Sequence, residues 1–216
     1  MTNNISIPPK FLIDRYKKWK SSEYLQNEVQ LRNLASSGQN PSTMVISCCD
    51  SRIHATSIFG ADEGEFFIHR NIANLVPPYS PDGENHGTSA AIEYAIKELK
   101  VQHLIILGHK DCGGIKYGHK VHLDSANTNY KFINKWLTIL LPAYNKIQKD
   151  IPVQDQINQL EQESIKTSIN NLFSFPFVNK AIEKNNLLIH GLIHDIGSGN
   201  LKFLNPATED FENFKL

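Results

Sequence analysis

The sequence predicts an α/β fold: a mostly parallel central β-sheet flanked by helices, with an amino-terminal helical arm. Two observations lead to this prediction. Short runs of aliphatic and β-branched residues recur along the chain, and longer segments with helical periodicity separate them. The runs are apolar at nearly every position instead of alternating, which indicates strands buried on both faces, as in parallel sheets covered by helices.

An amphipathic segment opens the chain. Between Tyr16 and Leu34, apolar residues recur among charged ones, which predicts one or two amphipathic helices that end at Gly38. We expect residues 1–38 to form the helical arm and residues 39–216 to form the α/β domain. No repeat or flexible linker divides the chain further, so we expect a single domain overall.

Four apolar runs predict the strands, in chain order Thr43–Cys48, Glu65–His69, His103–Gly108 and Asn186–His190. Three longer segments predict helices, namely Gly87–Lys100, Phe132–Ile147 and Gln154–Phe173. Pro142 should bend or divide the second of these helices, because proline lacks a backbone donor and clashes with the preceding turn.

Composition and charge exclude several classes of protein. The 22 basic residues balance the 22 acidic ones, which argues against a binder of nucleic acid or of acidic membranes. No apolar run approaches the ~20 residues that span a bilayer. The first residues show neither a secretory signal nor an Arg-rich transit peptide, so we expect a cytoplasmic protein.

The chain has only three cysteines, Cys48, Cys49 and Cys112. So small and odd a number does not make a disulfide framework, which leaves metal binding, nucleophilic chemistry or core packing. Cys48 ends the first predicted strand, and His109 and Cys112 follow the third. Because ligand sites of parallel sheets lie at the carboxyl ends of the strands, we expect these side chains to meet.

Cys48, His109 and Cys112 together form a donor set that favours zinc. Two thiolates and one imidazole are soft ligands suited to tetrahedral coordination. Three protein ligands leave a fourth position for water, which distinguishes catalytic zinc from structural zinc. A structural site would need a fourth protein ligand, and Asp50 is the only nearby candidate.

Asp50 and Arg52 can assist zinc chemistry. Zinc lowers the pKa of bound water from about 15.7 to about 7, which produces hydroxide near neutral pH. Asp50 can accept the hydrogen bond of that hydroxide, while the Arg52 guanidinium can hold the carboxylate through two hydrogen bonds and keep it off the metal. If the backbone stays extended, Cys49 points away from Asp50 and is expected to be a small core residue.

These residues resemble the β-class carbonic anhydrases, whose pattern is Cys-x-Asp-Ser-Arg and, further along, His-x-x-Cys-Gly-Gly. Cys48-Cys49-Asp50-Ser51-Arg52 matches the first half, and His109-Lys110-Asp111-Cys112-Gly113-Gly114 matches the second. The resemblance extends over Gln39–Phe177 and includes the segments Arg70–Pro78 and Gly87–Tyr94. Residues 39–216 are therefore expected to be a zinc-binding catalytic domain.

The resemblance implies one zinc ion per subunit on the two thiolates and the imidazole, with Asp50 and Arg52 as a catalytic dyad. The implied reaction is the reversible hydration of carbon dioxide to bicarbonate and a proton by attack of zinc-bound hydroxide. The resemblance also implies a homodimer or a dimer of dimers, formed through the arm and the sheet edge. The implied pocket for carbon dioxide consists of Gln39, Phe67, Ile72, Tyr94 and the backbone amide of Gly113.

The family has an open style and a style in which bicarbonate closes the Asp onto the metal. The regulatory bicarbonate pocket of the second style contains Trp, Arg and Tyr. Here Arg70 is present, but Val45 and His194 stand where the Trp and the Tyr would be. The chain resembles the open, plant-like style, so we expect water and not Asp50 in the fourth position near neutral pH.

Two alternative functions remain open at this point. The same scaffold can hydrolyse carbon disulfide or carbonyl sulfide. A catalytically silent zinc module could instead bind bicarbonate as a sensor, although the intact Asp50, Arg52 and Gln39 argue against this.

Overall fold

The structure is a computed structural model that describes residues 6–81, 86–124 and 130–214. It divides into two compact units, Met1–Asn40 and Pro41–Leu216. Residues 1–5, which belong to the predicted amino-terminal arm, lie outside the described residues. No helix within the described ranges combines the length and apolar character needed to cross a bilayer.

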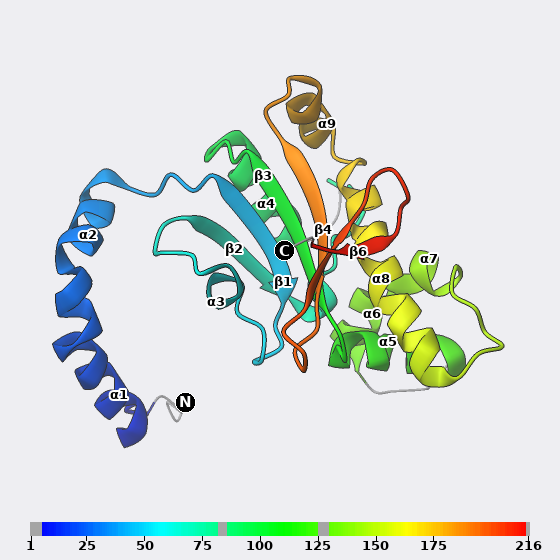
Figure 1. Cartoon of the computed structure of the whole chain (residues 1–216), viewed down its shortest axis with the longest axis horizontal. Helices are drawn as coiled ribbons and strands as arrows, with labels where there is room; N and C mark the ends of the chain where they lie inside the picture. Colours follow the sequence, from blue (N-terminus) through cyan, green and yellow to red (C-terminus); the bar gives the residue numbers. More distant parts are fainter. Residues whose placement is uncertain (1–5, 82–85, 125–129, 215–216) are drawn as a thin grey trace, which may run out of the picture. The chain divides into compact units, whose positions relative to one another are not determined.

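The amino-terminal unit consists of two helices, α1 (Lys10–Ser21) and α2 (Glu23–Ser37) (Figure 1). None of their residues is buried. The helices are separate because the chain leaves helical geometry at Ser22, whose hydroxyl donates to the Lys18 carbonyl at 2.7 Å and satisfies an acceptor that the end of α1 leaves free. Gly38 ends α2, as predicted, with a positive φ of 78° that favours glycine.

Six strands of the second unit form one mixed sheet in the order β2-β1-β3-β4-β5-β6 (Figure 1). The strands from β1 to β4 are parallel, whereas β5 and β6 pair antiparallel at one edge. The predicted α/β class with a mostly parallel sheet is therefore confirmed. The strands are β1 Thr43–Cys48, β2 Phe66–Asn71, β3 His103–His109, β4 Leu188–His194, β5 Leu201–Leu204 and β6 Phe211–Asn213.

Seven α-helices and two 3-10 helices, η1 (Ile72–Asn74) and η2 (Thr138–Leu140), are described in this unit. The helix α3 connects β1 with β2, α4 connects β2 with β3, and the other five α-helices lie between β3 and β4. Pro142 lies in the first turn of α7, where the missing N–H of proline breaks no helical hydrogen bond, so the predicted segment Phe132–Ile147 is divided. The helices are α3 Ala55–Phe59, α4 Gly87–Lys97, α5 Gly113–Asp124, α6 Lys131–Leu137, α7 Leu141–Tyr144, α8 Val153–Leu172 and α9 Pro176–Glu183.

Both faces of the central strands are covered. In β1, Met44 and Ile46 belong to one hydrophobic cluster, while the intervening Val45 belongs to another, and all three are fully buried. The first cluster includes residues of α4, α8 and α9, and the second includes Ala55 of α3. This arrangement explains why the strands are apolar at nearly every position.

Helix α8 packs closely against β3 and β4 because glycines face it. A Cβ atom placed on Gly108 of β3 would lie 2.7 Å from Cδ1 of Ile165. A Cβ atom on Gly191 of β4 would lie 3.0 Å from Cγ2 of the same residue. The position of α8 relative to the carboxyl end of β3 therefore depends on two glycines.

Candidate active site

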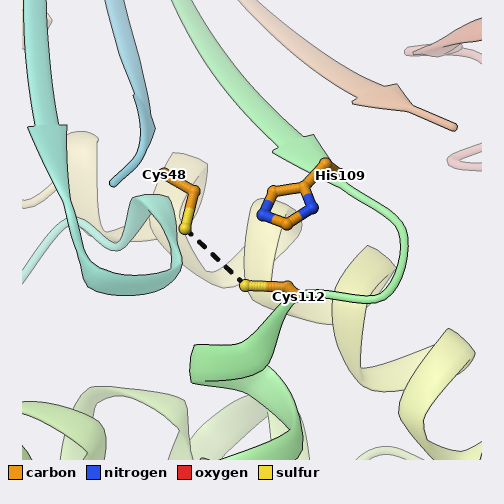
Figure 2. A group of neighbouring side chains, drawn as sticks. All are labelled: Cys48, His109 and Cys112. Atoms are coloured by element: carbon orange, nitrogen blue, oxygen red, sulfur yellow. Dashed lines mark hydrogen bonds between the residues drawn. The ribbon is translucent and has the colours of Figure 1, made fainter. Parts of the chain in front are cut away.

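The carboxyl ends of β1 and β3 bring together Cys48, His109 and Cys112 (Figure 2). Cys48 ends β1, His109 ends β3, and Cys112 directly precedes α5. All three residues are buried, and their donor atoms lie within 4.8 Å of one another. The prediction that these three side chains meet at the carboxyl ends of the parallel strands is therefore confirmed.

The two sulfur atoms have the separation expected of ligands on one ion. The Sγ atoms of Cys48 and Cys112 are 3.8 Å apart. Zinc–sulfur bonds of about 2.3 Å at a tetrahedral angle place two sulfurs about 3.8 Å apart, whereas a disulfide places them about 2.05 Å apart. The cluster therefore has the spacing of a tetrahedral zinc site.

The imidazole of His109 presents an unpartnered nitrogen to this cluster. Its Nδ1 lies 2.9 Å from the Lys110 carbonyl, so Nδ1 carries the proton and donates it to that oxygen. Its Nε2 is buried and has no hydrogen-bond partner among the described residues. Histidine ligands commonly donate their second ring nitrogen to a carbonyl in this way, so the cluster fits a zinc site.

The thiols of Cys48 and Cys112 affect each other's protonation. Their hydrogen bond lowers the pKa of Cys48. The same hydrogen bond, together with burial, raises the pKa of Cys112. In the metal-free site the two sulfurs therefore share one proton. A bound dication would replace that proton and neutralise two thiolates.

Arg52 holds Asp50 through two parallel hydrogen bonds. Arg52 Nε donates to Asp50 Oδ1 at 2.9 Å, and Arg52 Nη2 donates to Oδ2 at 2.7 Å. The guanidinium holds the pKa of Asp50 well below its usual range. Asp50 Oδ2 lies 3.9 Å from His109 Nε2, so the paired carboxylate borders the metal cluster. Arg52 Nη2 also donates to the Asp111 carbonyl at 3.2 Å.

Arg70 of β2 fixes the backbone that follows β1. Its Nε donates to the Cys48 carbonyl at 2.9 Å, and its Nη2 donates to the Asp50 carbonyl at 2.7 Å. Cys49, between these residues, is exposed, so the expectation that it fills the core is wrong. Its position just past the end of β1 places it outside the covered part of the sheet.

Two of the expected pocket residues are in contact. The rings of Phe67 on β2 and Tyr94 on α4 have centroids 5.8 Å apart. Phe67 is half-buried, and Tyr94 is exposed over 46% of its surface. Gln39 belongs to the amino-terminal unit, so its part in the pocket stays a prediction.

Ile72 lies against the start of α5. A Cβ atom placed on Gly114 would be 2.7 Å from Cγ2 of Ile72, so this contact requires a glycine. Gly113 is the first residue of α5, where backbone N–H groups have no acceptor within the helix. Ile72 therefore packs against Gly114, the residue that follows Gly113 in α5.

Glu161 of α8 is a site residue that the sequence reasoning missed. Its Oε1 accepts the Cys112 N–H at 3.0 Å, while its Oε2 is buried without a partner among the described residues. The side chain is 2% exposed, and burial raises its pKa to about 7. The available signal was a carboxylate on the apolar face of a predicted helix, one turn after Ile157 and one turn before Ile165.

The chain matches a family model described as carbonic anhydrase over residues 43–201. It is also 39% identical over 184 residues to beta carbonic anhydrase 3 of Arabidopsis thaliana, covering 84% of this chain and 70% of that protein. The chain belongs to the β-class carbonic anhydrases. This carbonic anhydrase is a lyase, and its reaction is the reversible hydration of carbon dioxide.

Solved β-carbonic anhydrases share the fold of this enzyme. The β-carbonic anhydrase CcaA superposes with a TM-score of 0.84 at 27% identity, covering 96% of this chain and 92% of that one. A tetrameric β-carbonic anhydrase of the ascomycete Sordaria macrospora gives a TM-score of 0.76 at 30% identity, covering 90% and 95%. The expected membership of the β class is confirmed.

Proposed function

We propose that Cys48, His109 and Cys112 hold one zinc ion per subunit and that Asp50 and Arg52 form the catalytic dyad for carbon dioxide hydration. The observation that carries this proposal is the sulfur separation of 3.8 Å beside an unpartnered His109 Nε2. A zinc ion with three protein ligands supplies Lewis acidity, which lowers the pKa of water in its open position to about 7.

Asp50 orients the attacking oxygen. Arg52 lowers the pKa of this carboxylate, so Asp50 stays ionised and can accept a hydrogen bond from the nucleophile. That bond directs a lone pair of the nucleophile toward the carbon of the substrate. Both carboxylate oxygens accept hydrogen bonds from Arg52, which holds Asp50 beside the metal site and opposes its binding to the metal. This pairing supports the open style.

The substrate pocket combines apolar contacts with one amide donor. Carbon dioxide is small and uncharged, so it needs an apolar surface and a donor for one oxygen. We assign the apolar surface to Phe67, Tyr94 and Ile72, and the donor to the backbone N–H of Gly113. Gln39 is the proposed polar residue of the pocket.

The proposal is tested by measuring zinc content and turnover together. We expect one zinc ion per chain, rapid carbon dioxide hydration in a stopped-flow assay with a pH indicator, loss of both on chelation, and recovery with added zinc. Negligible hydration by zinc-replete protein would overturn the proposal. The family match favours hydration over hydrolysis of carbon disulfide or carbonyl sulfide, which sulfide release would reveal.

We also propose that the chain forms a homodimer or a dimer of dimers. Helices α1 and α2 carry large apolar side chains, none of which is buried. Large apolar side chains that remain exposed together are typical of protein interfaces. The exposed residues are Phe11, Leu12, Tyr16, Trp19, Leu25 and Val29.

The proposed compartment is the cytoplasm. All three cysteines are free in the described structure, and zinc binding requires reduced thiols, which the cytoplasm maintains. Cell fractionation with detection of the protein tests this assignment, and recovery in an oxidising compartment would contradict it.

A further inference from the structure

A cleft of about 810 Å³ lies at the end of the sheet where β3 and β4 begin. It runs between the carboxyl ends of α4 and α9, and Figure 1 shows α9 at the opposite end of β4 from α5. His103 lines the cleft and begins β3, whereas His109 of the metal cluster ends the same strand. At about 3.3 Å per residue, the two histidines are about 20 Å apart, so the cleft is separate from the active site.

Lysines form the rim of this cleft, which we call the lysine cleft. Lys97 and Lys100 lie on one side, Lys180 lies on α9, and Lys184 directly follows α9. No carboxylate of the described residues lines the cleft. Lys97 pairs with Glu93. The other three lysines take part in no ion pair within the described part of the chain. The cleft therefore concentrates positive charge in a chain whose net charge is zero.

The floor of the lysine cleft is apolar and partly aromatic. Leu188 is exposed over 57% of its surface, although it begins a strand of the central sheet. The ammonium of Lys97 lies 4.9 Å from the centroid of the Phe177 ring. His103 also lines the cleft. A ligand can thus place an apolar or aromatic body below its anionic groups.

Three amide side chains complete the lining. Gln102, Asn185 and Asn186 border the cleft, and their side chains make no hydrogen bond within the described residues. Each amide offers both donors and an acceptor. Such groups can form hydrogen bonds with the polar edge of a planar ring.

We propose that the lysine cleft binds an organic phosphate of nucleotide size. Lysine ammonium groups bind phosphate as point charges, and several of them suit a ligand with more than one negative charge. The volume of about 810 Å³ lies within the range of about 300–1,000 Å³ that is usual for small-molecule sites. The phosphates contact the lysines, and the ring system lies on Phe177 and Leu188 beside the amides.

Calorimetric titration of the zinc-loaded, full-length protein tests the proposal, with ATP in the absence of magnesium as the probe. We expect saturable binding of ATP that weakens as sodium chloride is added. Tripolyphosphate and adenosine should each bind more weakly than ATP. Absence of saturable ATP binding would overturn the proposal. Equal affinity for tripolyphosphate would overturn the assignment of an organic ligand, and equal affinity for adenosine would overturn the role of the lysines.

Paired substitutions locate the binding site. Lys180→Gln with Lys184→Gln should weaken ATP binding about tenfold or more, because each lost ammonium removes a charge-assisted contact. Lys131→Gln with Lys135→Gln is the matched control, since these lysines are also exposed and four residues apart, but on α6 outside the cleft. Both variants should keep their zinc and their carbon dioxide hydration. Equal ATP affinity in the two variants would place the site elsewhere and overturn the proposal.

Discussion

Glu161 is a carboxylate in surroundings that a carboxylate ordinarily avoids. This carboxylate is 2% exposed and, among the described residues, accepts a hydrogen bond only from the Cys112 N–H, at the position where α5 begins. The positive end of the α5 dipole and the hydrogen bond favour the anion, whereas burial opposes it. The net result is a raised pKa of about 7.

Replacing Glu161 with Gln should remove part of the pH dependence of stability in the metal-free protein. The pKa of Glu161 rises from 4.5 to about 7 on folding, so its ionisation disfavours the folded state increasingly as pH rises between these values. At about 1.4 kcal/mol per pH unit, the effect is about 3 kcal/mol. Urea unfolding of metal-free, chelator-treated protein should show that Glu161→Gln gains roughly 3 kcal/mol of stability over wild type between pH 5 and pH 8.

The glutamine keeps an oxygen that can accept the Cys112 N–H, so it serves as a near-isosteric replacement. Glu161→Ala removes the acceptor as well and leaves the amide of Cys112 buried without a partner, which should cost about 1–3 kcal/mol. Identical pH profiles for wild type and Glu161→Gln would contradict the assigned burial effect.

Asp50→Asn should impair catalysis without removing the metal. The amide has the size of the carboxylate, but it lacks the negative charge and one of the two oxygens that accept hydrogen bonds from Arg52. We expect kcat/KM for carbon dioxide hydration to fall about a hundredfold, because the attacking oxygen is no longer oriented, while zinc content stays unchanged. Stopped-flow kinetics and metal analysis measure the two quantities.

The matched control for this substitution is Asp111→Asn. Asp111 is exposed, pairs with Lys116 at 2.8 Å and lies in the loop between His109 and Cys112. Its φ of 58° is a conformation that asparagine tolerates well. Asp111→Asn should keep its activity, whereas full activity in Asp50→Asn would contradict the catalytic role assigned to Asp50.

The residues of the metal cluster could be predicted because they follow strands that the topology places side by side. Cys48 and His109 end neighbouring parallel strands, so their spacing along the chain translates directly into proximity. Glu161 could not be placed in the same way, because it reaches Cys112 from a helix 49 residues further along the chain. Its packing depends on how α8 crosses the sheet, which periodicity alone does not determine.

At the scale of elements, the contact between α8 and β3 sets the position of the strand that carries His109. Gly108→Ala should destabilise the fold by about 1–3 kcal/mol, because its new methyl group would meet Ile165 Cδ1 at 2.7 Å. Ile165→Val removes that Cδ1 atom and should recover part of the loss in the double variant. Urea unfolding of the four proteins in this cycle gives the coupling.

Gly87→Ala provides the control for this cycle. A Cβ atom at Gly87 meets nothing within 4 Å, and the residue begins α4, so the substitution should leave stability unchanged or slightly raised. Strictly additive effects of Gly108→Ala and Ile165→Val would show that the two residues do not meet as described.

The elements themselves were predictable to different degrees for physical reasons. The strand Thr43–Cys48 has its predicted bounds, because every one of its residues is buried and its apolar run has clear ends. The strands β5 and β6 were not predicted, since they have only four and three residues and none of them is fully buried. Runs this short are too brief to be distinguished by periodicity, although Leu201 and Phe203 of β5 pack against a core cluster.

At the scale of the whole molecule, the apolar surface of α2 should determine assembly. Leu25→Asp with Val29→Asp should shift the protein to a smaller sedimenting species, because the two side chains are 58% and 75% exposed and charges there would oppose burial at an interface. Gln26→Asp with Gln30→Asp adds the same charge at the same spacing on exposed polar positions. Sedimentation velocity that does not distinguish these variants would contradict an interface through α2.

Arg52 connects two loops that supply the metal donors from different strands. The guanidinium that holds Asp50, after β1, also donates to the carbonyl of Asp111, after β3. The metal ligands are therefore held close together before the metal binds. The conformational entropy of bringing them together is lost when the protein folds and not when it binds the metal. Arg52 thus strengthens the chelate effect of the site, so its loss would speed metal release as well as misdirect Asp50.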